Sequence, residues 1–553
     1  MTAIDPPARK VYETEVLIIG GGVTGTGVMR DLALRGINCL LIDRKDLNAG
    51  ASGGNHGLLH SGGRYASTDW ETAAECRIEG EILKRTAAEC IDECGGLFVA
   101  VDGDGADFIS NFPDHCARAG IDCQALSPTE ARKAEPSLSN KVIAAYALPD
   151  ATVDPFHITL GNVNHAQHLT DSVYLPHTEA VEFEIRDGVI VSVLCRDRRA
   201  GQAVRIRAKQ IVNAAGAWAM GVARLAGCSD VDLLYAKGTL VITNSRFSNG
   251  VINRLRPPGD GDILVPGGTV SLLGTTSDTV ASLDDIHPTI DEVDHILSEG
   301  MPMLPGLTQT RFIRAFSGVR PLLQAADAGD DARKASRGFR LFDHEDQGLV
   351  NFASLVGGKL TTYRLMAEKT GTLIAGRLGN DQPCKTASEP LPKADTVRWT
   401  EPGFAPRYWY ARNDPSDAIL CECEMVPQSA VDAIIRSAPG AETHMTLRAI
   451  AMRSRIGKGA CQGAFCAARV TSHLYDHGTF QGDEGRGHLR DFVSERFKGV
   501  RPVLWGKQMP QMELAEALHC GLMGLDLISG DDIKNSDGEN DDLQTADSVG
   551  PSQ

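Results

Sequence analysis

The feature that most constrains the fold is a glycine-rich turn between two predicted strands at the N-terminus. Residues 15–19 are apolar and predict a buried parallel strand, and the motif Gly20-x-Gly22-x-x-Gly25 follows directly. A predicted helix and a second short strand come next, and that strand ends at Asp43. This strand–turn–helix–strand order indicates a Rossmann-like unit rather than a flexible glycine-rich loop.

Each residue of the motif has a physical reason for its type. Gly20 allows the tight turn, Gly22 allows the backbone to approach a pyrophosphate, and Gly25 allows the helix to pack on the strand. The helix N-terminus presents free N–H groups and a partial positive charge to the phosphates. Asp43 can accept hydrogen bonds from ribose hydroxyls. We therefore predict a dinucleotide cofactor.

The motif alone leaves open whether that cofactor is FAD or NAD. Two later segments, 211–218 with Gly216 and 356–359 with Gly358, are strands that run into small residues. Small residues let the backbone lie against a flat ligand. Flavoproteins of this type carry the motif at the N-terminus and use late segments for the same cofactor, so the pattern favours FAD.

The charge balance bears on the partners of the chain. The 55 basic and 72 acidic residues give a formal charge of −17, which argues against nucleic acid. The first residues lack the apolar core of a signal peptide, and no apolar run is long enough to span a membrane. We expect a cytoplasmic location, with attachment to a membrane surface left open.

Four of the 14 cysteines are clustered near the C-terminus. They form two pairs, Cys421-x-Cys423 and Cys461-x4-Cys466. Four thiolates suit either a 2Fe–2S cluster or a tetrahedral zinc ion. Zinc sites favour pairs with two to four intervening residues, so the C-x-C pair favours the cluster over zinc.

The motifs along the chain resemble those of flavin-dependent glycerol-3-phosphate dehydrogenases, over about residues 12–527. The chain is most similar to the large (A) subunit of the bacterial anaerobic enzyme, which carries a ferredoxin-like module with a C-x-C pair. The motifs that carry this resemblance are NHGLLHSGGRYA (55–66), DATVDPF (150–156), VNAAGAW (212–218), DILVPGG (262–268), SGVRPL (317–322), VGGKLTTYRLMAE (356–368), CECE (421–424), GKGACQGAFCAAR (457–469) and FKGVRPVLWG (497–506).

The resemblance implies oxidation of sn-glycerol 3-phosphate to dihydroxyacetone phosphate, with a hydride passed to FAD and a proton to a base. His60 is the candidate base, because imidazole exchanges a proton readily near pH 7. His56 is expected to be structural or to contact the flavin. Arg320 is expected to polarise the substrate oxygen or to hold the phosphate, and the sequence leaves both roles open.

Further residues are assigned to substrate and cofactor. A cationic grip on the phosphorylated polyol is expected from side chains in the recognised motifs and from one residue in ASRG. The expected substrate-binding residues are Arg64, Tyr65, Arg337 and Lys359. The expected FAD-binding residues are Gly20, Gly22, Gly25, Asp43, Ser52, Gly216, Gly358, Lys359 and Thr361. Thr361 or Thr362 would open a helix whose N-terminal dipole, with Lys359, stabilises negative charge on the flavin.

The expected fold class is α/β with α+β character. A Rossmann-like FAD-binding domain is interleaved with an antiparallel-sheet substrate domain, and a small helical four-cysteine module follows. The predicted FAD-binding segments are 12–85, 150–218 and 340–384, and the substrate-domain segments are 86–149 and 219–339. After them come a linker (385–416), the 2Fe–2S module (417–475), a helical extension (476–528) and a disordered acidic tail (529–553).

The module also bears on the partners. Reduced flavin holds two electrons and the cluster accepts one at a time, so the module would pass electrons singly to a partner and then to quinone. The resemblance implies two further subunits, of which one is a second flavoprotein and the other a membrane-anchoring iron–sulfur protein. Two alternatives remain: a dehydrogenase or oxidase of another polyol phosphate or 2-hydroxy acid, and an electron-transfer protein without catalysis.

Overall fold

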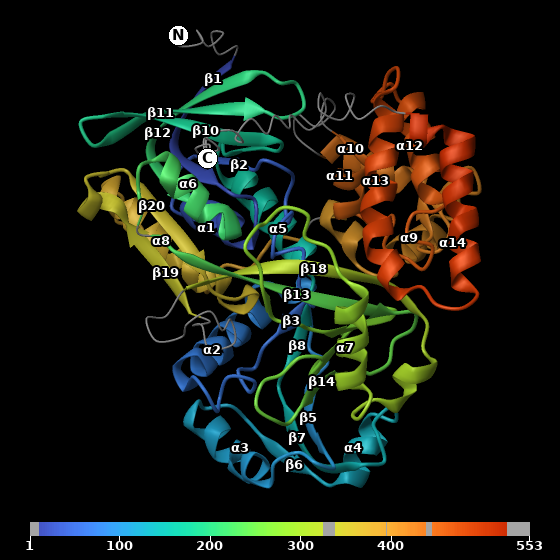
Figure 1. Cartoon of the computed structure of the whole chain (residues 1–553). Coiled ribbons are helices and arrows are strands. Elements are labelled where there is room, and N and C mark those ends of the chain that lie inside the picture. Colours follow the sequence, from blue (N-terminus) through green and yellow to red (C-terminus); the bar gives the residue numbers. More distant parts are fainter. Residues whose placement is uncertain (1–9, 230, 324–337, 394, 438–444, 528–553) are drawn as a thin grey trace, which may run out of the picture.

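The computed structural model describes residues 10–229, 231–323, 338–393, 395–437 and 445–527. Figure 1 shows three regions: a sheet with covering helices at the upper left, a second sheet in the lower half, and C-terminal helices at the right. Among the described residues, no helix combines the length and apolarity that crossing a membrane requires.

The first region confirms the predicted N-terminal unit. Its sheet has the order β10-β11-β12-β1-β2-β9, and β20 pairs in parallel with the end of β12. The strands are β1 (Lys10–Ile19), β2 (Cys39–Ile42), β9 (Val173–Leu175), β10 (Thr178–Arg186), β11 (Val189–Asp197), β12 (Ala203–Asn213), β19 (Phe339–Asp343) and β20 (Phe352–Gly357). The parallel strands β2, β1, β12 and β20 place the glycine-rich turn and the two late glycine segments at one edge of the sheet.

Helices cover both faces of this sheet. Helices α1 (Val23–Leu34), α5 (Pro155–Leu169) and α8 (Tyr363–Arg377) pack on one face, around the buried side chains of Val16, Met29 and Ile374. On the other face, α6 (Ala219–Leu225) packs in a cluster with Phe352 of β20 and Phe183 of β10, two strands of the same sheet. Burial on both faces explains why β1 ends in, and β2 consists of, uninterrupted apolar residues.

The second region is a larger, mainly antiparallel sheet. Its order is β17-β13-β16-β15-β14-β5-β7-β6, and β18 pairs with β13 along its length. The strands are β5 (Gly96–Val101), β6 (Gln124–Leu126), β7 (Val142–Leu148), β13 (Leu233–Thr243), β14 (Val251–Arg254), β15 (Ile263–Gly267), β16 (Val270–Gly274), β17 (Asp278–Thr279) and β18 (Phe312–Leu323). Its helices are α3 (Ala106–Arg118), α4 (Pro128–Ala134) and α7 (Ile290–Gly300).

Short elements join the two sheets. The strands β3 (Leu58–Leu59), β4 (Ile91–Asp92) and β8 (Ala151–Val153) form a small third sheet. Helix α2 (Trp70–Thr86) follows the loop after β3 and contacts the turn before α8. Arg364 on α8 forms a buried ion pair with Glu79 on α2, with an N–O distance of 2.7 Å. This pair ties α2 to α8 of the first region.

The C-terminal region has its own core. It contains the hairpin β21 (Ile419–Cys421) and β22 (Val426–Pro427), and the helices α9 (Phe404–Arg412), α10 (Gln428–Ser437), α11 (Leu447–Met452), α12 (Cys466–Asp476), α13 (Glu484–Val500) and α14 (Gln508–Ala517). Side chains from α9 to α13 share one buried cluster, which includes Ala405, Ile450 and Phe492.

Two boundaries differ from the predicted ones. The segment 385–416, predicted as a linker, contains α9, and Trp399 is buried against Phe404 and Tyr408 in the core of the C-terminal region. Helix α13, from the predicted extension 476–528, packs into the same core through Leu489 and Phe492. The polar, proline-rich composition of 385–416 concealed a few aromatic residues that find partners only in the fold. The predicted acidic tail 529–553 lies outside the described residues.

Candidate functional site

A cavity of about 1470 Å³ lies at the edge of the first sheet and extends to the second. This exceeds the ~300–1000 Å³ of common small-molecule pockets, so a dinucleotide and a substrate can both be accommodated. The lining includes most of the predicted site residues: Gly20, Gly22, Asp43, Ser52, His60, Arg64, Tyr65, Gly216, Arg320, Gly358 and Lys359. Arg337 lies outside the described residues.

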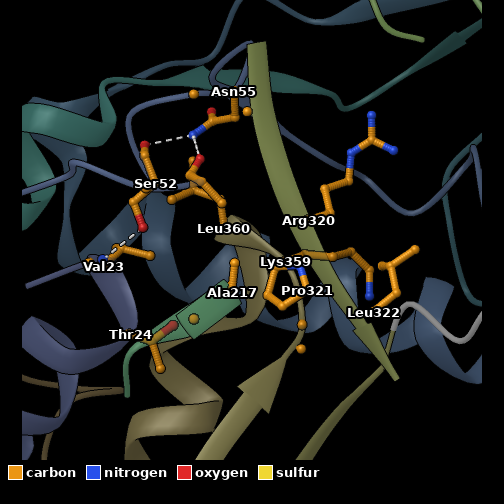
Figure 2. A pocket seen from close by; sticks show the side chains of 18 of the residues that line it. Val23, Thr24, Ser52, Asn55, Ala217, Arg320, Pro321, Leu322, Lys359 and Leu360 are labelled. Atoms are coloured by element: carbon orange, nitrogen blue, oxygen red, sulfur yellow. Dashed lines mark hydrogen bonds between the residues drawn. The ribbon is translucent and has the colours of Figure 1, made fainter. Parts of the chain in front are cut away.

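The glycine-rich turn has the geometry of a phosphate cradle. Gly20 has a φ of +119°, and a Cβ on Gly25 would lie 2.0 Å from the Gly20 carbonyl oxygen. Gly22 has an ordinary backbone conformation, with a φ of −77°, and faces the cavity. Ser52 accepts a hydrogen bond from the Val23 amide at 3.0 Å (Figure 2). Gly20 and Gly25 thus serve packing, whereas Gly22 and Ser52 line the anion-binding end of α1.

Asp43 lies where β2 ends, beside this turn. Its carboxylate accepts hydrogen bonds from the amides of Gly21 and Lys45, each at 2.7 Å. Burial raises the pKa of Asp43 above its usual value. A carboxylate offers about four lone-pair positions, so two of them remain for ribose hydroxyls.

His60 is held from two sides by buried groups. Its backbone N–H donates to the Thr361 hydroxyl at 3.3 Å, and the next amide, of Ser61, donates to Asp150 at 2.7 Å. The second carboxylate oxygen of Asp150 accepts from the Asn253 side chain at 3.0 Å. Sequence analysis assigned no role to Asp150 or Asn253, although Asp150 begins the motif DATVDPF.

The rings beside His60 belong to His56 and Tyr65. The His60 ring centroid lies 5.9 Å from that of His56 and 5.3 Å from that of Tyr65. Burial, together with the positive charges of Arg320 and Arg64, lowers the pKa of His56 to about 3. The Nδ1 atom of His56 accepts the Leu58 amide at 3.1 Å, so a neutral ring protonated on Nε2 fits this position. This geometry favours the structural role for His56.

Three cationic side chains project toward the same cavity. Arg64 donates to the Gly259 carbonyl at 2.9 Å and pairs with buried Asp262 at 3.3 Å. Arg320 donates to the Thr275 hydroxyl at 2.7 Å and the Thr276 carbonyl at 2.8 Å. The Lys359 ammonium lies 5.1 Å above the Tyr65 ring. The distance along the chain from Arg64 to Asp262 explains why sequence analysis missed the acid, although Asp262 opens the motif DILVPGG.

Two close approaches around Arg320 require glycine. A Cβ on Gly54 would lie 2.9 Å from the Gly318 Cα, and a Cβ on Gly318 would lie 2.2 Å from the Gly54 carbonyl oxygen. The loop after β2 thereby lies directly on β18, and in Figure 2 the Arg320 side chain extends from β18 on the side away from Ser52. A Cβ on Gly238 would lie 2.1 Å from an Arg320 Nη atom, so the missing side chain makes room for the guanidinium.

The turn before α8 separates the roles predicted for Thr361 and Thr362. Residues 360–362 form a single 3-10 turn, and α8 begins at Tyr363 with Thr362 as its N-cap. The Thr362 hydroxyl is within 3.3 Å of the Lys359 amide, which donates to it. Thr361 is fully buried, and its hydroxyl supports His60 rather than the helix end.

The four clustered cysteines converge in the C-terminal region. The Sγ atoms of Cys421 and Cys423 are 3.8 Å apart, and those of Cys423 and Cys461 are 3.6 Å apart. Thiol hydrogen bonds from Cys423 and Cys466 lower the pKa of Cys461 to about 2. Two thiolates bound at ~2.3 Å to one tetrahedral metal are about 3.8 Å apart, so the donors fit a metal centre. A Cβ on Gly459 would lie 2.6 Å from the Cys423 sulfur.

The four-cysteine region is docked against the first sheet by buried charges. Arg453 pairs with Asp46 at 2.9 Å, and Tyr174 donates to the same carboxylate at 3.0 Å. Burial opposes ionisation of Asp46, but the Arg453 guanidinium holds its pKa below the usual value. The Lys458 ammonium lies 4.3 Å above the Phe156 ring of α5, and burial lowers its pKa to about 7. The loop that leads to Cys461 is therefore in contact with α5 of the first region.

Comparisons with known proteins agree on one family. The FAD dependent oxidoreductase family (DAO) matches residues 15–372. The A subunit of anaerobic glycerol-3-phosphate dehydrogenase from Escherichia coli K12 is 39% identical over 540 residues, which cover 94% of this chain and 98% of the relative. The A1 subunit of the same enzyme from Haloferax volcanii is 36% identical over 92% of this chain and 91% of the relative.

A solved structure supports the fold. The glycerol-3-phosphate dehydrogenase of Bacillus halodurans, determined as a complex with FAD, superimposes with a TM-score of 0.62 at 19% identity. The superposition covers 90% of this chain and 97% of that structure. The mixed α/β fold class predicted from the sequence is confirmed.

Proposed function

Since the chain belongs to the FAD dependent oxidoreductases, and among them to the A subunits of anaerobic glycerol-3-phosphate dehydrogenase, we propose that it oxidises sn-glycerol 3-phosphate to dihydroxyacetone phosphate with FAD. One observation carries this proposal beyond the family relationship. A single cavity contains the phosphate cradle of α1, His60 and three cationic side chains. A dinucleotide and a phosphorylated alcohol are the ligands that such a cavity suits.

The chain's residues fit FAD at the edge of the first sheet. Gly22 and the free N-terminus of α1 would hold the pyrophosphate, and Asp43 would hold the ribose. Gly216 has open space beside its Cα, and Gly358 has a φ of +80°, so both allow the backbone to face a flat ring. When bound, FAD supplies the hydride acceptor.

We assign His60 the role of general base. Its imidazole would accept the proton of the substrate C2 hydroxyl, because a neutral imidazole is a suitable acceptor near pH 7. The hydrogen bonds from the backbone amides of His60 and Ser61 to Thr361 and Asp150 keep this backbone in place, and His60 lines the cavity. His56 is a poor alternative, since its pKa of about 3 leaves it a weak proton acceptor.

We assign the cationic side chains to the phosphate and the reacting oxygen. The guanidinium groups of Arg64 and Arg320 match the oxygens of a phosphate or an alkoxide, and Lys359 adds a third charge. The Tyr65 ring neighbours both Lys359 and His60, which supports its proposed contact with the substrate. Arg337, expected in the same group, remains an expectation.

Substrate discrimination tests this assignment. Purified protein with a dye acceptor should oxidise glycerol 3-phosphate far faster than glycerol, because glycerol lacks the anion. Arg320→Ala should cost ~1.5–3 kcal/mol in kcat/KM for the phosphate ester, as for a lost charge-assisted hydrogen bond. The exposed residue Arg436 offers a matched control, and Arg436→Ala should leave kcat/KM unchanged. Equal use of glycerol and its phosphate would contradict the proposed anion site.

We further propose that Cys421, Cys423, Cys461 and Cys466 hold a 2Fe–2S cluster that passes electrons onward. The convergent sulfurs support a metal centre, and the contact of Lys458 with Phe156 on α5 brings the cysteine loop to the region that would hold FAD. When bound, the cluster supplies a one-electron acceptor. A zinc ion would suit the same donors but would carry no electrons.

The proposed destination of the electrons is a membrane quinone. Two further subunits, a second flavoprotein and a membrane-anchoring iron–sulfur protein, would receive the chain at the inner face of the cell membrane. The similar proteins are named as A and A1 subunits, which supports the presence of other subunits in the assembly. Measuring quinone reduction with membranes that contain or lack those subunits would test this arrangement.

A further inference from the structure

Three ligand-type side chains meet in the C-terminal region, away from the four cysteines. They are Asp432 on α10 and His473 and His477 at the end of α12. The Nε2 atom of His473 lies 2.7 Å from Asp432 Oδ1, and the Nε2 atom of His477 lies 3.3 Å from the same oxygen. The two imidazole rings are 4.4 Å apart between centroids.

The helix geometry directs both imidazoles to one place. His473 and His477 are four residues apart, so they lie on the same face of the chain at successive turns. Two histidines with this spacing are a common metal-binding pair on helices, completed by a carboxylate from another element. Here the neighbouring helix α10 supplies that carboxylate.

We propose that Asp432, His473 and His477 bind a single divalent transition-metal ion, with zinc as the best match. Zinc binds imidazole nitrogen at ~2.0–2.1 Å and carboxylate oxygen at ~2.0–2.2 Å, so two ligand atoms on a tetrahedral ion are about 3.4 Å apart. The separation of 3.3 Å between His477 and Asp432 already matches this value. The separation of 2.7 Å for His473 requires only a small rotation of the ring.

The burial of the three side chains suits a partly open site. The His473 side chain is 7% exposed and that of Asp432 is 17% exposed, whereas the His477 side chain is 42% exposed. A metal ion here would be reached from solvent on the His477 side, and water would complete its coordination. Two largely buried ligands and one exposed ligand allow the ion to enter without unfolding the region.

The ion would clamp α10 to α12. These helices follow the two cysteine pairs, because α10 begins directly after the β21–β22 hairpin and α12 begins at Cys466. His473 is seven residues from Cys466, or ~10 Å along the helix at 1.5 Å per residue. The site is therefore separate from the cysteines, and the proposal does not depend on what the cysteines bind.

The test is a comparison of zinc binding by the full-length protein and its His477→Ala variant, after dialysis against a chelator. The exposed His477 is suited to substitution, and flavin absorbance reports that the fold is kept. His295→Ala is a matched control, because His295 on α7 is also exposed and lies 3.3 Å from a single carboxylate, that of Asp260. Equilibrium dialysis with zinc gives the number of ions bound per chain and the affinity of each.

We expect the unsubstituted protein and His295→Ala to bind one more zinc ion per chain than His477→Ala, or the same ion at least ~100-fold more tightly, since outer-shell partners alone change affinity ~10–100-fold. Cobalt added in place of zinc should give weak visible bands at this site without the intense thiolate charge-transfer band. Equal stoichiometry and affinity in all three proteins would overturn the proposal. A cobalt difference spectrum dominated by thiolate absorption would also overturn it.

Discussion

The cofactor cavity and the four-cysteine region place their reactive groups in opposite ways. In the cavity, His60 depends on Asp150, Asn253 and Thr361, which lie 90 to 301 residues away along the chain. In the C-terminal region, Cys421 and Cys423 belong to one hairpin, Cys461 lies in the loop before α12, and Cys466 is the first residue of α12. The proposed catalytic geometry therefore depends on the whole fold, whereas the proposed metal-binding geometry depends on the spacing within two short cysteine segments.

Contacts on several elements join the two regions, and one group of them lies beside the glycine-rich turn. Asn48 donates to the Pro155 carbonyl at 3.1 Å, its amide donates to Gly21, and the neighbouring Phe156 lies under Lys458. The ion pair between Asp46, two residues before Asn48, and Arg453 also joins the two regions. If the two regions act independently, a variant within the cavity should leave metal content unchanged, and a variant of the cysteines should leave flavin reduction unchanged. Only variants at the contacts between the regions should affect both.

The largest expected effect is that of Gly22→Val. The backbone at Gly22 accepts any side chain, and its Cβ would lie 3.0 Å from the Ser52 hydroxyl, so the chain should still fold. The added branches would occupy the place of the pyrophosphate, and we expect FAD absorbance and dehydrogenase activity to be lost completely. Metal content in the C-terminal region should stay unchanged. Gly376→Val, at an exposed glycine with no atom near its Cβ position, is the control. Full flavin content in Gly22→Val would show that the pyrophosphate does not bind at Gly22.

Cys461→Ser should give the converse result. Removal of one sulfur should abolish the signal of the proposed cluster and electron delivery to the proposed partner, while glycerol 3-phosphate still reduces the flavin in single turnover. Cys520→Ser, a half-buried cysteine of the same region, should retain both functions. Metal analysis that finds zinc without iron would indicate a structural role for the cysteines and would contradict electron transfer through them. Loss of flavin reduction in Cys461→Ser would show that the two regions are not separable.

His60→Asn should affect the chemistry alone. We expect kcat to fall ~10²-fold or more, as for the loss of a general base, with normal flavin and metal content. His168→Asn, at an exposed histidine on α5, serves as the control. Stopped-flow measurement of flavin reduction isolates this step from later electron transfer. A near-normal rate at pH 7 would remove His60 from the proposed mechanism.

Asp46→Asn should have the smallest effect on catalysis. Its effect should be on the stability of the contact between the two regions. Losing the charged partner of Arg453 should destabilise their docking by ~1.5–3 kcal/mol. Because folding lowers the pKa of Asp46, its contribution is present above the unfolded value of ~3.9 and is lost as the pH falls through the folded pKa. Thermal unfolding at pH 7 should separate the variant from the native chain, and the difference should shrink toward pH 3. The exposed carboxyl of Asp114 provides a control in Asp114→Asn.

Sequence reasoning predicted most of the local structure where that structure depends on neighbouring residues. The glycine-rich turn, its helix and Asp43 lie within 30 residues, and their geometry follows from local rules for turns and helix ends. The cysteine pairs also lie in short segments whose spacing restricts their ligands. The bounds of the C-terminal region were harder to predict, because the contacts of Trp399 and Phe492 with its core leave no periodic pattern in the chain.

The sequence by itself therefore determined the cofactor-binding unit, the family resemblance and the identity of the candidate side chains. Only the tertiary structure decided how those side chains are held: that Thr361 supports His60 while Thr362 bonds to the Lys359 amide, that Asp262 pairs with Arg64, and that Gly54 and Gly318 bring two backbones into contact. The physical reason is that hydrogen bonds, ion pairs and close packing act over a few ångströms in space. Residues far apart in the chain carry no local sign of such contacts before the chain has folded.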